Sequence, residues 1–448
     1  MLTSMYTAVS GMDANGTALS VISDNISNMN TIGFKSSTVT FGDVLSQSLT
    51  GASAASQLGR GVQVMSVTPQ FTQGSFESTS NGLDLAVDGD GFFMVTDSAG
   101  AKYYTRDGEF SIDKNGNIVN PDNLALQGYL ADAAGNITGT TGNLQIATRQ
   151  SPANITTAAQ VALNLDATAT PPAAAFTLDG NGDGIPNDPA NFNFSDTTTI
   201  YDSQGGAQQV TMYFVKTAAN TWTTHYAYAD PGNPGSLMEA GQTSGGAGNP
   251  PVGAAATQAL TFNADGSLNN DNSGTALAFN FGGGVTAPQN VSFNFGTGTG
   301  EAPAGTGLDM TTQFASASSV MNLTQDGYAS GSLKSVSVSQ AGVITGVFTN
   351  GQTRAIGQVA LARFIAPTGL TKLGRNLYGE SFNSGQPIIG QANTSGIGQV
   401  TSNSLELSNV DLAQEFVKMI TAQRGFEANS KVITTTDQLM QELVNLKQ

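Results

Sequence analysis

Two groups of side chains in this sequence have the types and spacing that could do chemistry, and the first suggests a metal site. Residues 179–184 read DGNGDG, so oxygen-bearing side chains occupy alternate positions and glycine the sixth, as in the opening of a calcium-binding loop. The glutamate expected at the twelfth position is absent, because Ala190 stands there. The candidate ligands are Asp179, Asn181 and Asp183; the alternative, a Gly/Asp turn without metal, is the interpretation we favour.

The second group would be catalytic. His225 is the single histidine, so a Ser-His-Asp triad is conceivable, but no nucleophile elbow accompanies it and a structural histidine is the favoured interpretation. The glycine-rich stretches lack the Lys-Ser/Thr ending of a phosphate-binding loop. The chain of 448 residues has no cysteine, which excludes disulfides, thiolate nucleophiles and cysteine-metal sites. The sequence therefore predicts a protein without catalytic residues or cofactor, and not an enzyme.

The most regular pattern in the chain is an apolar row near its C-terminus, within residues 408–448. This spacing predicts a long amphipathic helix with a coiled-coil seam. Ser408 followed by Asp411 predicts the capped start of this helix. Gly425 lies inside the pattern and predicts a close approach to another backbone. The predicted interface positions on this helix are Leu412, Phe416, Met419, Phe426, Ile433 and Met440.

A second amphipathic helix is predicted at the N-terminus, from Thr3 to Asn28, where Asn and Gly residues end it. Two interpretations of these helices remain open at this point. They form a helical hairpin that packs on one globular core, or they pack with copies of the same chain. The predicted interface positions on the first helix are Leu2, Met5, Val9, Met12, Leu19 and Ile26.

Between the helices the pattern changes to short alternating strands separated by Gly, Asn and Asp turns. Residues 34–61 read as a connector that could hold a short helical turn, followed by a strand at 61–67. One set of strands is predicted at 83–87, 91–95, 101–105 and 109–112, and a second set at 333–338, 343–348 and 358–364. We expect the two sets to form one β-domain. An inserted antiparallel barrel or sandwich is predicted from strands at 161–165, 197–201, 210–215, 222–228, 276–281 and 291–295.

The charge and hydropathy of the chain exclude several classes of partner. The formal net charge is −17, with 11% charged residues, and Lys216 is the one cation between Gln150 and Leu323. This acidity disfavours nucleic acid and anionic membranes as partners. No apolar run is long enough to span a membrane, and no signal peptide is recognisable, which by itself predicts a cytoplasmic protein.

Three blocks, in order along the chain, resemble the bacterial flagellar axial proteins, which form the rod and the hook. They are residues 23–35 (SDNISNMNTIGFK), residues 72–93 (from TQGSF through NGLDLAV to GFF), and residues 408–446. Within that family, residues 199–205 (TIYDSQG), 212–216 (MYFVK) and 326–328 (DGY) resemble hook proteins. The resemblance covers about residues 1–150 and 323–448 with patches between, and it does not extend over 167–189 or 231–307.

The resemblance implies a structural subunit that assembles with itself into a curved helical tube, the universal joint between rod and filament. It implies further contacts with the distal rod protein, the hook-filament junction protein and the hook cap. It also implies export, without a cleaved leader, through the flagellar type III apparatus to the extracellular hook. The alternatives are a distal rod subunit of the same family and, from a different class, a secreted calcium-binding surface protein.

The same resemblance, with the strand pattern, implies terminal helices plus nested antiparallel β-domains, arranged as four parts. The terminal helices form the inner assembly domain and the β-domains lie outside it. The expected parts are 1–30 with 405–448 as the inner helical domain, 31–75 as a connector, 76–150 with 324–404 as the first β-domain, and 151–323 as an inserted outer β-domain.

Overall fold

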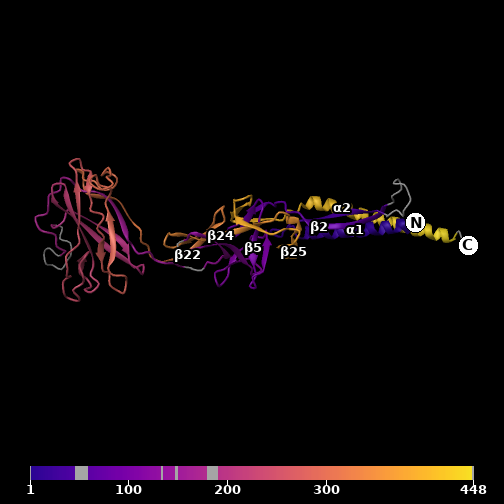
Figure 1. The fold of residues 1–448 in the computed structure, drawn as a ribbon, viewed down its shortest axis with the longest axis horizontal. Coiled ribbons are helices and arrows are strands. Elements are labelled where there is room, and N and C mark those ends of the chain that lie inside the picture. Colours follow the sequence, from indigo (N-terminus) through magenta and orange to yellow (C-terminus); the bar gives the residue numbers. More distant parts are fainter. Residues whose placement is uncertain (1, 46–58, 133–134, 147–149, 179–189, 446–448) are drawn as a thin grey trace. The chain divides into compact units, whose positions relative to one another are not determined.

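The structure, a computed structural model, divides into two compact units (Figure 1). Unit 1 comprises Met1–Arg149, Leu333–Val347 and Thr353–Gln448, and unit 2 comprises Gln150–Ser332 and Phe348–Gln352. All residues are described except 1, 46–58, 133–134, 147–149, 179–189 and 446–448. The predicted fold class is confirmed, because the terminal helices contact each other and the rest of the chain is mainly antiparallel sheet.

The two long helices of unit 1 are α1 (Leu2–Ser27) and α2 (Leu412–Asn445), which lie side by side (Figure 1). The cap of α2 differs from the one predicted. The Asp411 carboxylate accepts hydrogen bonds from the backbone N–H groups of Ala413 and Gln414 at 2.9 and 3.2 Å, so Asp411 is the N-cap. Ser408 lies before the helix, where its hydroxyl accepts from the Val410 N–H at 3.4 Å.

The described residues of the segment after α1 form an antiparallel pair of strands; residues 46–58, which could hold the helical turn, lie outside the described residues. The strands are β1 (Ser37–Leu45) and β2 (Gly59–Pro69), and both contact α1. The physical reason is the run of β-branched residues from Thr38 to Thr40, which favours a pleated, half-buried strand over a helix. The strand predicted at 61–67 is confirmed within β2.

The main sheet of unit 1 joins the two predicted sets of strands, because β24 (Thr353–Arg363) pairs with both β5 (Phe92–Thr96) and β9 (Ala125–Ala131). Its order continues from β22 (Gly331–Val338), β23 (Val343–Phe348), β24, β9 and β5 to β6 (Lys102–Thr105), β26 (Leu377–Gly379) and β25 (Thr371–Gly374). Attached to this order are β10 (Ile137–Asn143), β27 (Ile388–Gln391), β7 (Ser111–Ile112) and β8 (Ile118–Val119). A buried apolar cluster that includes Leu85, Phe93, Leu126, Ile344 and Leu361 covers this sheet.

Two short ribbons and one turn of 3-10 helix complete unit 1. β28 (Gln399–Ser402) pairs with β4 (Leu85–Asp88), and β29 (Ser404–Glu406) pairs with β3 (Phe76–Ser78). The helical turn η1 spans Pro367–Gly369. These ribbons bring the residues just before α2 alongside the residues just after β2.

Several hairpin turns share the pattern Asp-x-x-Gly, and their acids are structural. The Asp113 carboxylate accepts hydrogen bonds from the N–H groups of Asn115 and Asn117 at 2.7 and 2.8 Å. Gly116 in the same turn has φ +88°, a conformation that glycine adopts without steric cost. The hydrogen bond from the Asn117 side chain, with those from the backbone, lowers the pKa of Asp113. These acids explain part of the negative charge of the chain without a ligand.

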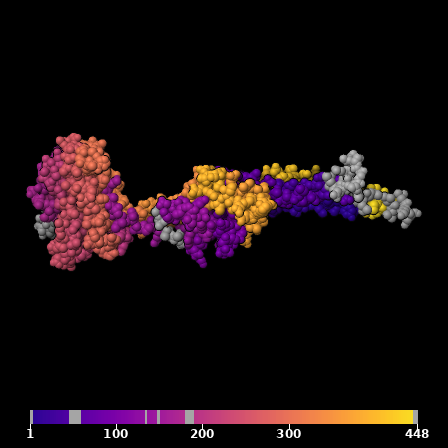
Figure 2. Space-filling model, viewed as in Figure 1, coloured from indigo at the N-terminus to yellow at the C-terminus, as the bar shows by residue number. Residues whose placement is uncertain are grey.

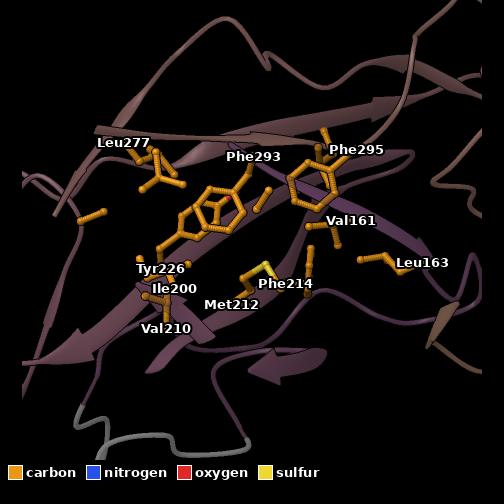
Figure 3. Close-up of a cluster of buried hydrophobic side chains, with 14 of the residues drawn as sticks. Val161, Leu163, Ile200, Val210, Met212, Phe214, Tyr226, Leu277, Phe293 and Phe295 are labelled. Atoms are coloured by element: carbon orange, nitrogen blue, oxygen red, sulfur yellow. The ribbon is translucent and has the colours of Figure 1, made fainter. Parts of the chain in front are cut away.

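Unit 2 is a sandwich of two sheets around one apolar core (Figure 3). One sheet has the order β13 (Phe194–Tyr201), β14 (Ala207–Ala218), β15 (Thr221–Ala229), β17 (Gln258–Phe262) and β18 (Leu268–Asn270), with β16 (Leu237–Glu239) beside β15. The other has the order β19 (Leu277–Phe279), β20 (Gln289–Asn294), β12 (Ala158–Asn164) and β21 (Ser319–Gln325). At its margin β11 (Gln150–Ser151) pairs with the first two residues of β22.

The core of unit 2 explains the strands that the sequence predicted and those it missed. Val161, Phe214 and Phe293 alternate with outward-facing residues and point into the space between the sheets (Figure 3). The six predicted strands of the insert are all present. The strands β16, β17, β18 and β21 were not predicted, and the pair β12–β20 is parallel where an antiparallel sheet was expected.

Candidate assembly interface

The contact between α1 and α2 is made by small and polar residues. A Cβ added to Gly11 would lie 2.7 Å from the Asn429 side chain, and one added to Gly425 would lie 2.9 Å from the Asn15 side chain. Each helix therefore places a glycine opposite an asparagine of its partner, in an antiparallel register. Gly425 does mark a close approach, as predicted, but to a side chain of α1 and not to its backbone.

The predicted interface residues flank this contact and are not buried in it. On α1, Met5 is 44% and Val9 36% exposed; on α2, Phe416 is 46% and Phe426 43% exposed. Met12, Leu19, Ile26, Met419 and Ile433 are half-buried, Leu412 and Met440 are exposed, and the side chain of Leu2 lies outside the described residues. Both helices thus carry apolar side chains that the pairing within the chain leaves uncovered. Part of the surface of α1 (indigo) and of α2 (yellow) is open to view in Figure 2.

The residues that pair the two helices are not those that the apolar pattern predicts. The heptad pattern predicts large apolar residues at the contact, whereas the buried helix residues are mostly small or polar and include Ala8, Ala14, Ile22, Asn25, Glu415, Ala422 and Thr436. Two glycines in the sequence do indicate the true contact between the helices. Gly11 and Gly425 each interrupt a helical pattern, and glycine weakens a helix by about 1 kcal/mol relative to alanine. Such glycines are retained where two helices approach closely.

Polar contacts attach the helix pair to the β1–β2 hairpin. The Asn25 side chain donates to the Ser37 carbonyl at 2.9 Å and accepts from the Ser37 N–H at 2.9 Å, as an adjacent strand would. The same amide donates to Glu415 of α2 at 3.2 Å, and Glu415 also accepts from Lys418 at 2.7 Å. Asn25 is buried, so these bonds determine where α1, α2 and β1 meet.

Asn409, two residues before the cap of α2, makes the second attachment. Its side-chain oxygen accepts from the Ser36 N–H at 2.8 Å, and its amide donates to the Gln70 carbonyl at 2.8 Å and to the Thr72 hydroxyl at 2.8 Å. One side chain therefore joins the segment after α1, the end of β2 and the segment before α2. Thr72 and Asn409 belong to two of the three sequence blocks that carried the family resemblance, and Ser36 directly follows the third.

A buried ion cluster lies beside Asn409 in unit 1, which we call the junction triad: Lys35, Glu406 and Arg106. The Glu406 carboxylate is 2.6 Å from the Lys35 ammonium and 3.2 Å from the Arg106 guanidinium, and all three side chains are almost inaccessible to solvent. Glu406 also accepts from the Gly74 N–H at 2.9 Å. No sequence pattern predicted this cluster, because its members lie far apart in the chain.

The remaining hydrogen-bonding groups of the triad are satisfied mostly by backbone carbonyls. Lys35 donates to the Thr72 carbonyl at 2.8 Å, and Arg106 donates to the Gly89 carbonyl at 2.8 Å. Burial lowers the pKa of Lys35, Glu406 acts in the opposite direction, and Arg106 lowers it further. A buried cluster of this kind stabilises the fold only while every member is present.

Gly33 makes the close packing at the triad possible. It has φ +68°, and a Cβ at this position would lie 2.5 Å from the backbone nitrogen of Asp107 and 2.6 Å from the carbonyl carbon of Arg106. Its N–H donates to the Glu406 carbonyl at 2.7 Å. Only glycine combines this conformation with this approach.

Asp107, next to the triad, gives a prediction about pH. Burial raises the pKa of Asp107 to about 6 against the hydrogen bond from the Glu109 N–H, and the nearby acids Glu109, Asp122 and Asp84 add to the increase. The folded state therefore holds a proton that the unfolded state releases near pH 4, so this contribution to stability is lost as the pH rises through about 6.

We expect Asp107→Asn to stabilise unit 1 by about 1–2 kcal/mol at pH 7.5 and to give no gain at pH 4, since the amide keeps the acceptor oxygen without the charge. Urea unfolding followed by far-ultraviolet circular dichroism at both pH values measures this. Asp97→Asn is the matched control, because backbone hydrogen bonds lower the pKa of that exposed acid and no gain at pH 7.5 is expected. Equal gains at both pH values would contradict the prediction.

The remaining candidate residues are His225, for catalysis, and the calcium-type loop at 179–184, for a metal. His225 contacts Glu239 at 2.9 Å and stacks on Phe176 with ring centroids 4.0 Å apart, as expected of a structural histidine. Asp179, Asn181 and Asp183 lie outside the described residues. Within the described part of the chain there is no group of three or more His, Cys, Asp or Glu residues that could hold a metal ion. In the same part, no helix has the length and apolar character needed to cross a membrane.

The chain matches curated proteins over its full length. It is 34% identical over 450 residues to the flagellar hook protein FlgE of Escherichia coli (strain K12), which covers 98% of this chain and 99% of that protein. It is 36% identical over 472 residues to the flagellar hook protein FlgE of Borreliella burgdorferi, with 100% of both chains covered.

The chain belongs to the flagellar hook protein family.

Family models divide this hook protein along its length. They are the Flagella basal body rod protein at residues 5–35, the FlgE/F/G D1 domain at 86–167, the FlaE D2 domain at 164–328 and the FlgEFG C-terminal region at 401–446. The D2 model includes the stretches 167–189 and 231–307, over which the sequence resemblance did not extend. Among solved structures, Helicobacter pylori flagellar hook protein FlgE2 aligns with a TM-score of 0.46 at 14% identity, covering 72% of this chain and 98% of that one.

The hook protein is therefore a structural subunit of the flagellar hook, an extracellular part of the flagellum, and not an enzyme. Because the hook relatives match through the insert as well as the ends, the alternative of a distal rod subunit is set aside. Membership of this family implies that the chain polymerises with copies of itself.

Proposed function

We propose that this hook protein polymerises through the uncovered apolar rows of α1 and α2, which form the inner wall of the curved hook tube. The observation that carries the proposal is the exposure of Met5, Val9, Phe416, Phe426 and Met440 on helices that already contact each other. Burying the exposed part of each such side chain contributes on the order of 1 kcal/mol, so one row repeated over many contacts stabilises a polymer. A contiguous apolar row of this length on a lone subunit marks an interaction surface.

The rows on the two helices differ in sequence, which favours head-to-tail association. A contact between two different patches of one chain does not close on itself unless the rotation completes a ring, so repeated contacts generate a helix. The polar outer sheets of unit 2, with Lys216 as the single cation of residues 150–323, repel one another at close range and do not compete for the contact. The helical ends are thus the assembly elements of the tube, which bends while it transmits torque.

The proposal extends to the role of each part of the chain and to its partners in the flagellum. Residues 1–30 with 405–448 act as the inner assembly domain, 31–75 as the connector, 76–150 with 324–404 as the first β-domain and 151–323 as the outer domain. The terminal contacts of the tube are with the distal rod protein, the hook-filament junction protein and the hook cap. The chain reaches the growing end through the flagellar type III export apparatus. Support for these partners comes from the family resemblance.

A single substitution on α2 tests the proposal. We expect Phe426→Asp to abolish polymerisation even at concentrations about tenfold above those that suffice for the unchanged chain, because a charge would enter each contact between copies at a cost of several kcal/mol. Sedimentation and electron microscopy measure the polymer.

The monomer should keep its β-sheet circular dichroism, since the Phe426 side chain is 43% exposed in the isolated subunit. Thr435→Asp, also exposed on α2 but outside the seven-residue row, adds the same charge and should leave polymerisation nearly unchanged. Normal tubes from Phe426→Asp would refute the proposed interface.

A further inference from the structure

A fully exposed phenylalanine lies on a rigid turn of unit 1, between β26 and β27. The Phe382 side chain is 101% exposed, the highest value among the large hydrophobic residues of the described chain. The turn is nonetheless well ordered by hydrogen bonds: the N–H groups of Asn383 and Ser384 donate to the Ser381 hydroxyl at 3.1 and 3.2 Å, and that hydroxyl donates to the Gly369 carbonyl at 2.6 Å. The protein thus presents an aromatic ring on a fixed support.

An apolar groove of matching character lies elsewhere in unit 1, where α1, β1 and α2 meet. Its volume is about 400 Å³, large enough for an aromatic side chain. Apolar side chains from all three elements line it, and those of Phe41 and Val417 are 43% and 64% exposed. The lining includes Ala18, Val21, Val39, Phe41, Val417 and Ala422.

A second large cavity, a hollow in unit 2, is also open to solvent, and charge distinguishes the groove from it. Lys418 borders the groove with its side chain 43% exposed, and Glu380 lies two residues before Phe382 on the same turn. The other hollow, in unit 2, contains Asp309 among its lining residues and belongs to a stretch whose one cation is Lys216. The Lys418 ammonium lies 2.7 Å from the Glu415 carboxylate, which also lines the groove, so these two charges balance and Glu380 is not repelled there, whereas Asp309 repels it from the hollow.

We propose that Phe382 of one copy docks into the groove between α1, β1 and α2 of a second copy. The proposal rests on the polymerisation proposed above and names a second contact outside the helical rows. Phe382 and the groove lie on different surfaces of one chain, so their contact is heterologous, as an open helical polymer requires. Aromatic anchors in apolar pockets supply most of the binding energy of typical interfaces.

Crosslinking between single-cysteine variants tests the pairing directly, and the absence of native cysteine makes each engineered thiol unique. Asn383→Cys places a thiol beside Phe382 and leaves the ring in place, and Thr421→Cys places one in the groove lining. A mixture of the two variants should give disulfide-linked dimers after assembly and mild oxidation. Each variant alone should give none, and neither should a mixture of Asn383→Cys with Met321→Cys in the unit 2 hollow.

Removal of the ring gives a second measurement. We expect Phe382→Ser to raise the critical concentration for polymerisation about tenfold or more, with monomer stability unchanged because the ring has no contacts to lose. Leu373→Ser removes another exposed apolar residue, 52% exposed, as the matched control and should have little effect.

The outcomes separate this contact from the helical interface. Tubes that form without a disulfide between the thiols at positions 383 and 421, or in which the thiol at position 383 links to the one at position 321, overturn the docking proposal and leave the helical rows standing. An unchanged critical concentration for Phe382→Ser also overturns it. A chain without substitutions that never polymerises removes the proposed function, and the docking contact with it.

Discussion

Removing residues 412–448 is expected to abolish polymerisation and leave a soluble monomer with intact β-sheets. The truncation deletes α2 and with it every α2 residue of the proposed interface, and it exposes the α1 face that Ala422, Gly425 and Asn429 cover. Without α2, the helix α1 keeps only its contacts with β1 and β2, so α1 should also lose part of its helicity. Sedimentation measures the polymer, and circular dichroism measures the loss of helix.

The cut after Asp411 is chosen so that the junction survives. Asn409 keeps its bonds to Ser36, Gln70 and Thr72, and the junction triad keeps Glu406. The single tryptophan, Trp222, is fully buried in unit 2, so its fluorescence should be the same in the truncated and full-length chains. Tubes formed by the truncated chain would refute the role of α2, and altered Trp222 emission would mean that the truncation disturbed unit 2.

Glu406→Ala is expected to destabilise unit 1 by about 3–5 kcal/mol, the largest effect predicted for a single substitution in this protein. The loss of the carboxylate leaves the Lys35 ammonium and the Arg106 guanidinium buried next to each other without a counter-ion. It also leaves the Gly74 N–H without its acceptor. Urea unfolding followed by circular dichroism measures the change.

A surface ion pair provides the comparison. Arg375 and Asp122 are 3.0 Å apart, but the Arg375 side chain is 77% exposed, so Arg375→Gln should cost less than about 1 kcal/mol. Lys35→Met combined with Glu406→Leu removes one positive and one negative charge together and should recover part of the stability lost in Glu406→Ala. Similar losses for Glu406→Ala and Arg375→Gln would show that the triad is not the main support of the junction.

The sequence alone determined the two terminal helices, many of the strands and the family of this protein. A period of seven residues over Leu412, Met419 and Phe426 predicts a helix wherever it occurs, because the period is a property of the local backbone. Alternation between Val210 and Val215 predicts a strand for the same reason. The three sequence blocks at 23–35, 72–93 and 408–446 predicted the flagellar family that the full-length relatives confirm.

Only the tertiary structure decided which faces and which distant residues meet. The apolar rows of α1 and α2 have the stronger pattern, yet Gly11 and Gly425 bring the helices together on the adjacent face, because close approach needs small residues more than large ones. Lys35, Arg106 and Glu406 carry no shared pattern. Their pairing depends on β29 lying beside β3 and on Gly33 lying against Arg106. Local periodicity is encoded residue by residue, whereas these contacts exist only once the two ends of the chain have returned to one place.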